Sequence, residues 1–251
     1  MLIHSPIESK RFDLNIFRST VDDLNVPLLA NEIKSNKVDI LILRMPCDKK
    51  PIQSQLAALP YKILHCDNLV YYQTLFSDDY KTLRNEIKLV EVDNHNLEEL
   101  KQLIPAIFKD YQNHYYSNPF LAKERITEGY AEWGQSYINT VAGRESWIVY
   151  EDQTAVAYGS CAYDDDQKTC EGILIGVHPD YQGRSIYKDF FRSIYNHYKS
   201  KGFKKMMIST QIQNYVVQNI WIKEGLTISH AFDTYHINSF LSHPERVQNS
   251  L

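Results

Sequence analysis

The 251-residue chain has little cysteine and little glycine. Its four cysteines are widely spaced and form no Cys-x-x-Cys pair, which argues against a zinc ribbon or a redox-active dithiol. We therefore expect reduced thiols of the cytosolic kind. The chain has only 9 glycines but 18 tyrosines. Tyrosine has a flat apolar ring with a hydroxyl group at its edge. This composition suits a polar ligand with apolar faces, such as a sugar, as well as ordinary packing.

Long apolar runs and a surplus of positive charge are also absent. No stretch approaches the roughly 20 apolar residues that span a bilayer, and residues 1–15 lack the apolar core of a signal peptide. The net charge of −4 provides no basic field for nucleic acid. With 43% hydrophobic and 23% charged residues, the sequence is typical of a globular chain. We expect a cytoplasmic protein that binds neither membrane nor nucleic acid.

Two regions are expected along the chain, a small α/β domain over residues 1–80 and a larger domain over residues 81–251. In the first region, helical spacing at 27–36 is followed by an apolar run at 37–45, which predicts a helix and then a buried strand. Residues 61–75 hold one or two further strands. The polar segment 77–86 lacks periodicity and is typical of a linker.

The second region combines strands, a hairpin and helices. Asn96 is a suitable N-cap for a helix over 97–108, and five polar residues at 164–168 join two apolar strands as an antiparallel hairpin would. The remaining elements are a strand at 87–92, strands at 146–151, 155–163 and 169–177, a helix at 186–201, a strand at 204–210, a helix at 216–225 and closing strands at 227–232 and 234–240.

The strongest chemical signal is a strand, a turn and a helix over residues 173–192. Gly183 and Ser185 are small residues at the start of the helix, where backbone N–H groups can approach a phosphate. The helix dipole adds about half a positive charge at this end, and Arg184 and Lys188 add charge at the rim. The pattern indicates an anion site, although an ordinary strand–helix connection has the same form.

These residues resemble motif A of the GNAT acetyltransferase superfamily, through Val177-x-Pro179-x-Tyr181-Gln182-Gly183-Arg184. In that family the segment binds the pyrophosphate of acetyl-CoA. Here Ser185 replaces the usual second glycine, and Tyr187 replaces a small residue. The resemblance implies that the ring of Tyr187 is directed away from the phosphates.

A second segment resembles motif B of the same family, through Asn214-x-x-Val217-x-x-x-Trp221-x-x-x-Gly225-Leu226. The resemblance covers about residues 88–240. It implies an α/β (α+β) fold of the GNAT type, with a central mixed, mostly antiparallel sheet splayed at the motif A strand. The small α/β domain precedes it.

The resemblance also implies a cosubstrate and its contacts. Acetyl-CoA would lie in the wedge between two splayed parallel strands, with its pantetheine arm paired to the first strand. No metal is needed, and the Asp164–Asp166 run is interpreted as a solvated turn rather than a cation site. The implied cosubstrate contacts are Ile175, Gly176, Val177, Gln182, Gly183, Arg184, Ser185, Ile186, Tyr187 and Asn214.

The layout of the whole chain is similar to nucleotide-sugar N-acetyltransferases related to dTDP-fucosamine acetyltransferase. That resemblance predicts an aromatic acceptor site containing Tyr115, Tyr116, Tyr130 and Trp133. The alternative for the same segment is an amphipathic cover over the sheet. A homodimer is compatible with the sequence.

Several residues are candidates for moving protons. Many family members use a motif B tyrosine as the acid, but Trp221 stands there, and an indole N–H is too weak an acid. Tyr215 is a candidate acid. Glu171 is a candidate base, or else a solvated hairpin residue. His178 and His236 are relay candidates, or else packing residues.

Three functions are therefore compatible with the sequence. The first is acetyl-CoA-dependent N-acetylation of an amino sugar, in particular the nucleotide-linked form used for surface polysaccharide. The second is acetylation of another small amine, such as an amino acid, a polyamine or a peptide. The third is a GNAT-fold protein that binds CoA without turnover.

Overall fold

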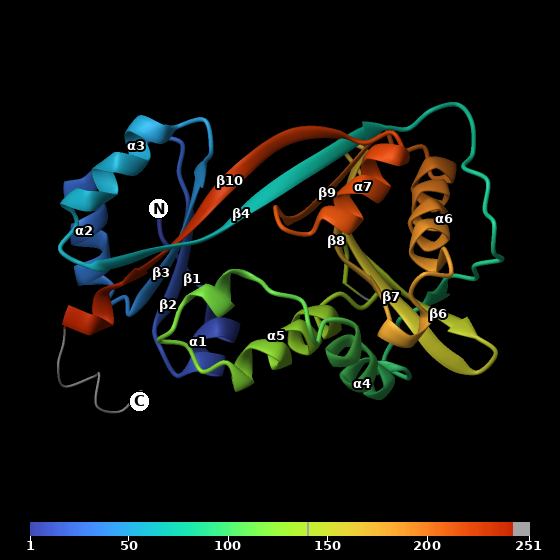
Figure 1. The fold of residues 1–251 in the computed structure, drawn as a ribbon, viewed down its shortest axis with the longest axis horizontal. Helices are drawn as coiled ribbons and strands as arrows, with labels where there is room; N and C mark the ends of the chain where they lie inside the picture. Colours follow the sequence, from blue (N-terminus) through green and yellow to red (C-terminus); the bar gives the residue numbers. More distant parts are fainter. Residues whose placement is uncertain (140, 243–251) are drawn as a thin grey trace.

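The computed structural model describes residues 1–139 and 141–242, which form one ten-stranded sheet with helices on both faces (Figure 1). Each strand is rich in apolar residues on at least one face, as the sequence pattern predicts. The strands are β1 (Ile3–His4), β2 (Ile16–Thr20), β3 (Ile40–Pro46), β4 (Lys62–Leu75), β5 (Val90–Glu91), β6 (Arg144–Glu151), β7 (Thr154–Asp164), β8 (Thr169–Val177), β9 (Lys205–Gln211) and β10 (Thr227–Asn238).

The helices divide between the two faces of this sheet. In Figure 1, α2 and α3 lie beside the left-hand part of the sheet, α6 and α7 lie at the right below the upper ends of β4 and β10, and α1, α4 and α5 lie along the lower side. None of the described helices is long and apolar enough to cross a membrane. The helices are α1 (Pro6–Phe12), α2 (Val26–Ser35), α3 (Lys50–Gln55), α4 (Leu97–Ile107), α5 (Glu124–Gln135), α6 (Ile186–Ser200) and α7 (Tyr215–Lys223), with short 3-10 turns η1 (Leu56–Ala58), η2 (His114–Ser117), η3 (Pro179–Tyr181) and η4 (Ser239–Ser242).

The sheet is mixed and mostly antiparallel, as the resemblance implied. The strand order is β1-β2-β3-β10-β4-β9-β8-β7-β6-β5. Only the β2–β3 and β8–β9 pairs are parallel among the described strands. The predicted hairpin is confirmed, because β7 and β8 pair antiparallel on either side of the polar turn. The expected strand at 87–92 is only the two-residue β5, and α1 was not expected.

Two long strands stand where one or two strands were expected over residues 61–75 and two closing strands over residues 227–240. The residues of β4 form a single strand, and β10 is continuous where two closing strands were expected. Polar residues that suggest a break are paired across the strands instead: His65 Nε2 lies 3.1 Å from Asp233 Oδ1, and Asn68 also bonds to Asp233. A register shift between Thr234 and Tyr235 accommodates the change of face.

These long strands join the two regions into one sheet. β10 pairs with β4 from Thr227 to Asn238, and its second half, from Phe232 onward, also pairs with β3. The C-terminal strand therefore completes the sheet of the N-terminal region (Figure 1). The division at residue 80 stays a prediction.

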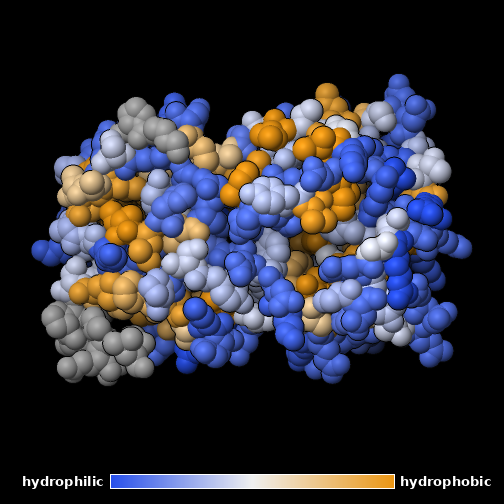
Figure 2. Space-filling model, viewed as in Figure 1, coloured by the Kyte–Doolittle hydropathy of each residue, from blue (hydrophilic) through white to orange (hydrophobic). Residues whose placement is uncertain are grey.

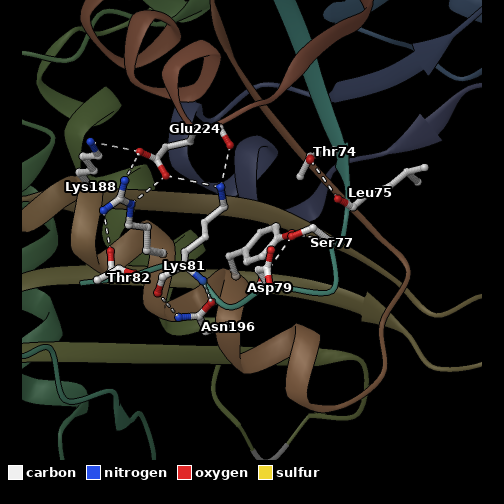
Figure 3. Close-up of polar contacts among 11 residues, drawn as sticks. Thr74, Leu75, Ser77, Asp79, Lys81, Thr82, Lys188, Asn196 and Glu224 are labelled. Carbon is white, nitrogen blue, oxygen red and sulfur yellow. Dashed lines mark hydrogen bonds and ion pairs between the residues drawn. The ribbon is translucent and has the colours of Figure 1, made fainter. Parts of the chain in front are cut away.

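The predicted linker at 77–86 has no regular structure and is bound along α6. The carboxylate of Asp189 accepts hydrogen bonds from the backbone N–H groups of Arg84 and Asn85, at 3.1 and 2.9 Å. Asn196 bonds both to the N–H and to the carbonyl of Lys81, each at 2.8 Å. Figure 3 shows Lys81 and Asn196 in this arrangement. Residues 77–86, called the strap below, thus follow β4 in the chain and are held against α6 by hydrogen bonds.

Glu224, directly after α7, joins the strap to α6 through a cluster of ion pairs. This buried carboxylate lies 2.8 Å from Arg192 Nε, 3.3 Å from Lys188 Nζ and 3.5 Å from Lys81 Nζ (Figure 3). Burial opposes its ionisation, but the hydrogen bonds and charge of Arg192 hold the pKa of Glu224 below its ordinary value. A depressed pKa means that the ion cluster stabilises the fold at neutral pH and loses that effect as pH falls through the folded-state value.

We expect Glu224→Gln to lower the free energy of unfolding by about 3 kcal/mol at pH 7, because three cations lose their carboxylate. Urea denaturation followed by circular dichroism would measure this. The difference from the wild type should narrow as the pH falls below 4.5, where the carboxylate begins to protonate. The exposed Glu128 provides the control, since Glu128→Gln should change stability by less than about 0.5 kcal/mol. Equal losses in the two variants would contradict the role of Glu224.

Candidate functional site

A cavity of about 400 Å³ lies on the sheet face that carries α1, α4 and α5. Its lining comes from both halves of the chain: from β3 and β4 on one side, and from β8, β9, α6 and α7 on the other. Figure 2 shows this side of the molecule hollowed near its middle, with hydrophobic side chains inside the hollow and a mainly hydrophilic surface around it. The described structure thus brings distant segments together around one candidate site.

The two parallel strands at this cavity splay apart, as the resemblance implied. Pairing between β8 and β9 ends at Gly172 and Ile208, although β8 continues to Val177 and β9 to Gln211. The backbone of residues 173–177 on that side therefore has no strand neighbour, and an extended ligand could pair with it. The wedge opens into the cavity.

Of the three β8 residues expected to contact the cosubstrate, only one is among the residues that line the cavity in the described structure. Ile175 lines the cavity, whereas Gly176 and Val177 do not. Gly176 packs against α4 so closely that a Cβ there would lie 2.3 Å from Ile107 Cγ2. Glycine at this position therefore allows α4 to pack on the strand, and Val177 belongs to the buried core.

The turn that precedes α6 presents its backbone to solvent. Gly183 has φ +78° and Ser185 has φ +65°, so both adopt the left-handed conformation that favours glycine. The space around Gly183 is open, since a Cβ added there would have no atom within 4 Å. Among the described residues, no acceptor pairs with the backbone N–H groups of residues 183–187. The turn and the helix start therefore form a surface of free donors suited to an anion.

The side chains of this turn are mostly engaged with the protein. Gln182 donates to the carbonyl of Val177 at 3.2 Å, and Arg184 lies 3.2 Å from Glu151 and over the ring of Tyr181. Ile186 is buried in the core beneath α6. Anion binding here thus depends on the backbone, with Arg184 and Lys188 at the rim.

Tyr187 and Trp221 form a hydrogen-bonded pair in the wedge. Trp221 Nε1 donates to the Tyr187 hydroxyl at 3.1 Å, and both residues line the cavity. Burial raises the pKa of Tyr187, while the Trp221 hydrogen bond opposes that rise. The ring is directed toward α7, and a phenol from α6 therefore lies beside the position where the family usually has its motif B tyrosine.

Asn214 lies at the start of α7 and also lines the cavity. Its side-chain amide donates to Thr210 Oγ1 at 3.0 Å, which connects the end of β9 to the helix. Tyr215, the next residue, is 66% exposed and is not among the residues that line the cavity. The structure therefore brings Asn214 to the wedge and leaves Tyr215 on the outer surface.

Glu171 lines the cavity at the N-terminal end of the splayed strand. Its half-buried carboxylate has a pKa raised by burial, and the positive charge of Arg44 acts against that rise. A carboxylate whose pKa is displaced upward is suited to accept a proton near neutral pH.

The aromatic residues expected at an acceptor site separate into two groups. Tyr115, Tyr130 and Trp133 line the cavity, and Tyr116 packs outside it against the core under α1. Tyr130 accepts a hydrogen bond from Asn113 at 2.7 Å, and Tyr115 accepts one from Arg18 at 2.8 Å. The two hydroxyls are held in place by these partners.

The histidines considered as proton relays do not line the cavity. His178 begins the η3 turn, and His236 is fully buried on β10. His236 Nε2 lies 2.8 Å from Nδ1 of His114, a cavity residue that the sequence reasoning did not select. Burial lowers the pKa of both rings, that of His236 to about 3, so the pair is neutral near pH 7.

Charged cavity residues of the N-terminal region were also missed, among them Glu8, Arg18 and Arg44. Arg44 was detectable in principle, because it is the single charged residue within the apolar strand segment 40–46. Glu8 lies on α1, which was not expected. Within residues 1–139 and 141–242, no group of three or more His, Cys, Asp or Glu side chains could hold a metal ion.

The comparisons with known proteins agree with this geometry. Residues 104–223 match the family described as the acetyltransferase (GNAT) family. That span includes the last turn of α4, all of α5, the splayed strands, the turn before α6 and the whole of α7. These 120 of the 251 residues are therefore similar to a GNAT acetyltransferase domain, and that family uses acetyl-CoA. No curated protein matches the chain.

Solved structures show the same fold at low sequence identity. A functionally unknown conserved protein from Staphylococcus epidermidis is 12% identical, with a TM-score of 0.60, and the match covers 94% of this chain and 90% of that one. A GCN5-related N-acetyltransferase from Sphaerobacter thermophilus is 9% identical, with 78% and 59% covered and a TM-score of 0.56. A GNAT-family protein from Novosphingobium aromaticivorans is 14% identical, with 80% and 75% covered and a TM-score of 0.52. The GNAT fold expected from the sequence is confirmed.

Proposed function

We propose that this protein transfers an acetyl group from acetyl-CoA to the primary amine of a small molecule bound in the cavity. The observation that carries the proposal is that the β8–β9 wedge and the half-buried carboxylate of Glu171 border one cavity, and that Tyr187, in the first turn of α6 directly after the free N–H groups, lines the same cavity. Such a space can hold a thioester and an amine side by side, and proximity supplies much of the rate.

Acetyl-CoA fits the residues present. The open space at Gly183 leaves the backbone accessible to a pyrophosphate, and the unpaired edge of residues 173–177 accommodates an extended arm. Acetyl-CoA supplies the activated acetyl group. Ser185 is tolerated because the contact is made by backbone N–H groups, and Tyr187 is compatible because its ring is directed toward Trp221.

In the proposed reaction, Glu171 accepts the proton of the attacking amine, directly or through a water. The amine nitrogen forms a bond to the thioester carbonyl carbon, and a backbone N–H of the splayed strand donates to the carbonyl oxygen as charge develops. When the carbon–sulfur bond breaks, the Tyr187 hydroxyl gives its proton to the leaving thiolate. Solvent then restores both groups, and the products are an N-acetyl amide and CoA.

Gly183→Val is the experiment that tests acetyl-CoA binding. We expect at least a tenfold loss of acetyl-CoA affinity in titration calorimetry, because the new side chain occupies the space beside the N–H groups. Gly202→Val is a matched control: Gly202 has φ +76°, also has open space around it, and lies at the other end of α6. The two variants should lose similar stability, and only the first should lose affinity. Equal affinities would overturn the assignment of the turn.

A catalytically silent CoA-binding protein is the alternative of a different class. It would bind acetyl-CoA with the same dependence on Gly183 and release no thiol with any amine. Incubation with acetyl-CoA and a broad amine panel, with detection of free CoA thiol, separates the two functions.

The narrower expectations from the sequence stay predictions. These are a nucleotide-linked amino sugar as acceptor, a place in polysaccharide synthesis, a homodimer and a cytoplasmic location. The acceptor can be tested in the same panel, because glucosamine and its nucleotide conjugate can be compared there with other amines.

A further inference from the structure

The cavity has a second, polar end that the proposed acetyl transfer does not use. The wedge end is formed by the splayed strands, and the opposite end is formed by the N-terminal region, including Arg18, Arg44 and His114. Glu171 and Tyr71 lie on the wall between these ends. An acceptor whose amine lies near Glu171 therefore extends toward the N-terminal region.

Arg44 of β3 places a guanidinium with an unpartnered nitrogen at that end of the cavity in the described structure. It is on the same face of β3 as Ile40 and Ile42, which pack under α1 and η2. Among the described residues, its Nε atom has no hydrogen-bond partner. Burial lowers the pKa of Arg44, although nearby Tyr71 and Asp67 oppose the effect. Arg44 is a partly buried cation, and such a charge is stabilised when an anion binds it.

The surroundings of Arg44 contain further unpartnered atoms. In the sheet register, Arg44 faces Thr234 of β10, and Thr234 in turn faces Asp67 of β4. Six buried side-chain atoms lack a hydrogen-bond partner in the described part of the chain, and four of them belong to this row of three residues. Of these three residues only Arg44 is among those that line the cavity in the described structure, so its Nε is the unpartnered atom that a bound ligand can reach.

The charges at this end favour an anion with a single negative charge. Arg18 is already neutralised by Glu8, with bonds of 2.5 and 2.7 Å, and Arg11 pairs with Glu132 at 2.8 Å. Burial raises the pKa of Asp67, while hydrogen bonding to Thr234 and the charge of Arg44 act against that rise. In the proposed reaction Glu171 faces the amine of the acceptor, so Arg44 is the described cavity cation at this end without an ion pair of its own. A carboxylate matches it, whereas a nucleotide diphosphate brings about two negative charges into a site with one.

We propose that Arg44 binds the carboxylate of the acceptor, so that the acceptor is an amino acid rather than a polyamine or an amino-sugar nucleotide. The inference rests on the proposed acetyl transfer. The guanidinium can hold a carboxylate by two parallel hydrogen bonds, while Glu171 on the neighbouring wall faces the amine. The N-terminal region then selects the acceptor, and the GNAT domain supplies the acetyl donor.

Matched acceptors test this with the wild-type protein. The panel contains the L-amino acids, β-alanine and 4-aminobutanoate, each compared with its carboxamide, together with spermidine, glucosamine and a uridine diphosphate conjugate of glucosamine. Thiol release from acetyl-CoA gives kcat/KM. We expect the best substrate to be a carboxylate, with its carboxamide about 30-fold poorer or worse, because the guanidinium then lacks its partner. A carboxamide, polyamine or amino-sugar nucleotide that equals the best amino acid would overturn the proposal.

Arg44→Gln should abolish the preference for the carboxylate over the carboxamide and leave acetyl-CoA affinity unchanged. Arg44→Lys should restore part of the preference, because it keeps the charge without the planar geometry. Arg84 is exposed and provides the control, so Arg84→Gln should behave as the wild type. An Arg44→Gln protein that is folded by circular dichroism and retains the full preference would refute the assignment.

A separate binding experiment distinguishes an error in the proposed acetyl transfer from an error in the proposed carboxylate site. If no amine is acetylated while acetyl-CoA binds, the proposed function is wrong, and the subsite is tested by calorimetry with N-acetyl amino acids in the presence of CoA. Binding that is lost in Arg44→Gln supports the carboxylate site. Equal binding in both proteins, or no binding to the wild type, overturns it.

Discussion

Glu171→Gln is expected to lower kcat by about 10²–10⁴-fold, the usual contribution of a positioned general base. The amide keeps the size of the side chain but cannot accept the proton of the amine. Burial raises the pKa of Glu171, so the acidic limb of the wild-type kcat/KM profile should lie above 4.5, the ordinary value. Because only the deprotonated form acts as a base, the rate rises with pH through that limb, and the limb should vanish in the variant. Steady-state kinetics from pH 5 to 9 would measure both effects.

The control for this variant is Glu91→Gln, on the exposed edge strand β5 far from the cavity. It should retain wild-type kinetics and the wild-type pH profile. The deficit of Glu171→Gln should also shrink at high pH, where more of the acceptor amine is already neutral. If Glu171→Gln retains its kcat across this range, proximity and a water relay explain the rate better, and Glu171 is a solvated wall residue.

Tyr187→Phe is expected to lower kcat by about 10²-fold while acetyl-CoA affinity changes little. The variant removes the hydroxyl that lies in the wedge and accepts the Trp221 hydrogen bond. Since burial raises the pKa of Tyr187, the phenol stays protonated at neutral and mildly alkaline pH, and the deficit should be constant from pH 6 to 9. Trp221→Phe should retain most activity, because the indole positions the phenol but gives up no proton.

A thioester with a more acidic leaving thiol sharpens this test, because such a thiol needs less help from a proton donor. If the Tyr187 hydroxyl protonates the leaving group, the loss of kcat in Tyr187→Phe should be smaller with this more reactive thioester than with acetyl-CoA. Tyr181→Phe is the matched control, since Tyr181 lies on the neighbouring turn outside the cavity lining. A constant deficit with both thioesters would indicate that Tyr187 only packs against the acyl donor.

The sequence alone determined the local parts of the site. A glycine and a serine before an amphipathic helix predicted the turn at residues 183–185, and the structure places both residues at positive φ. Two apolar strands around five polar residues predicted the β7–β8 hairpin. These features depend on neighbours within a few residues, where side-chain periodicity and backbone preferences decide the conformation.

The tertiary structure decided which distant residues meet. Arg44 and Glu171 line the same cavity although 127 positions separate them in the chain, and no local pattern connects them. Two closing strands were expected over residues 227–240, yet β10 is continuous there, and its Asp233 pairs with His65 and Asn68 of β4. Such pairing depends on both strands together. A polar side chain is stable within the sheet only when a side chain on the neighbouring strand forms a hydrogen bond with it. For this reason the conformation of the turn at residues 183–185 could be predicted from the sequence, whereas the polar end of the cavity required the assembled sheet.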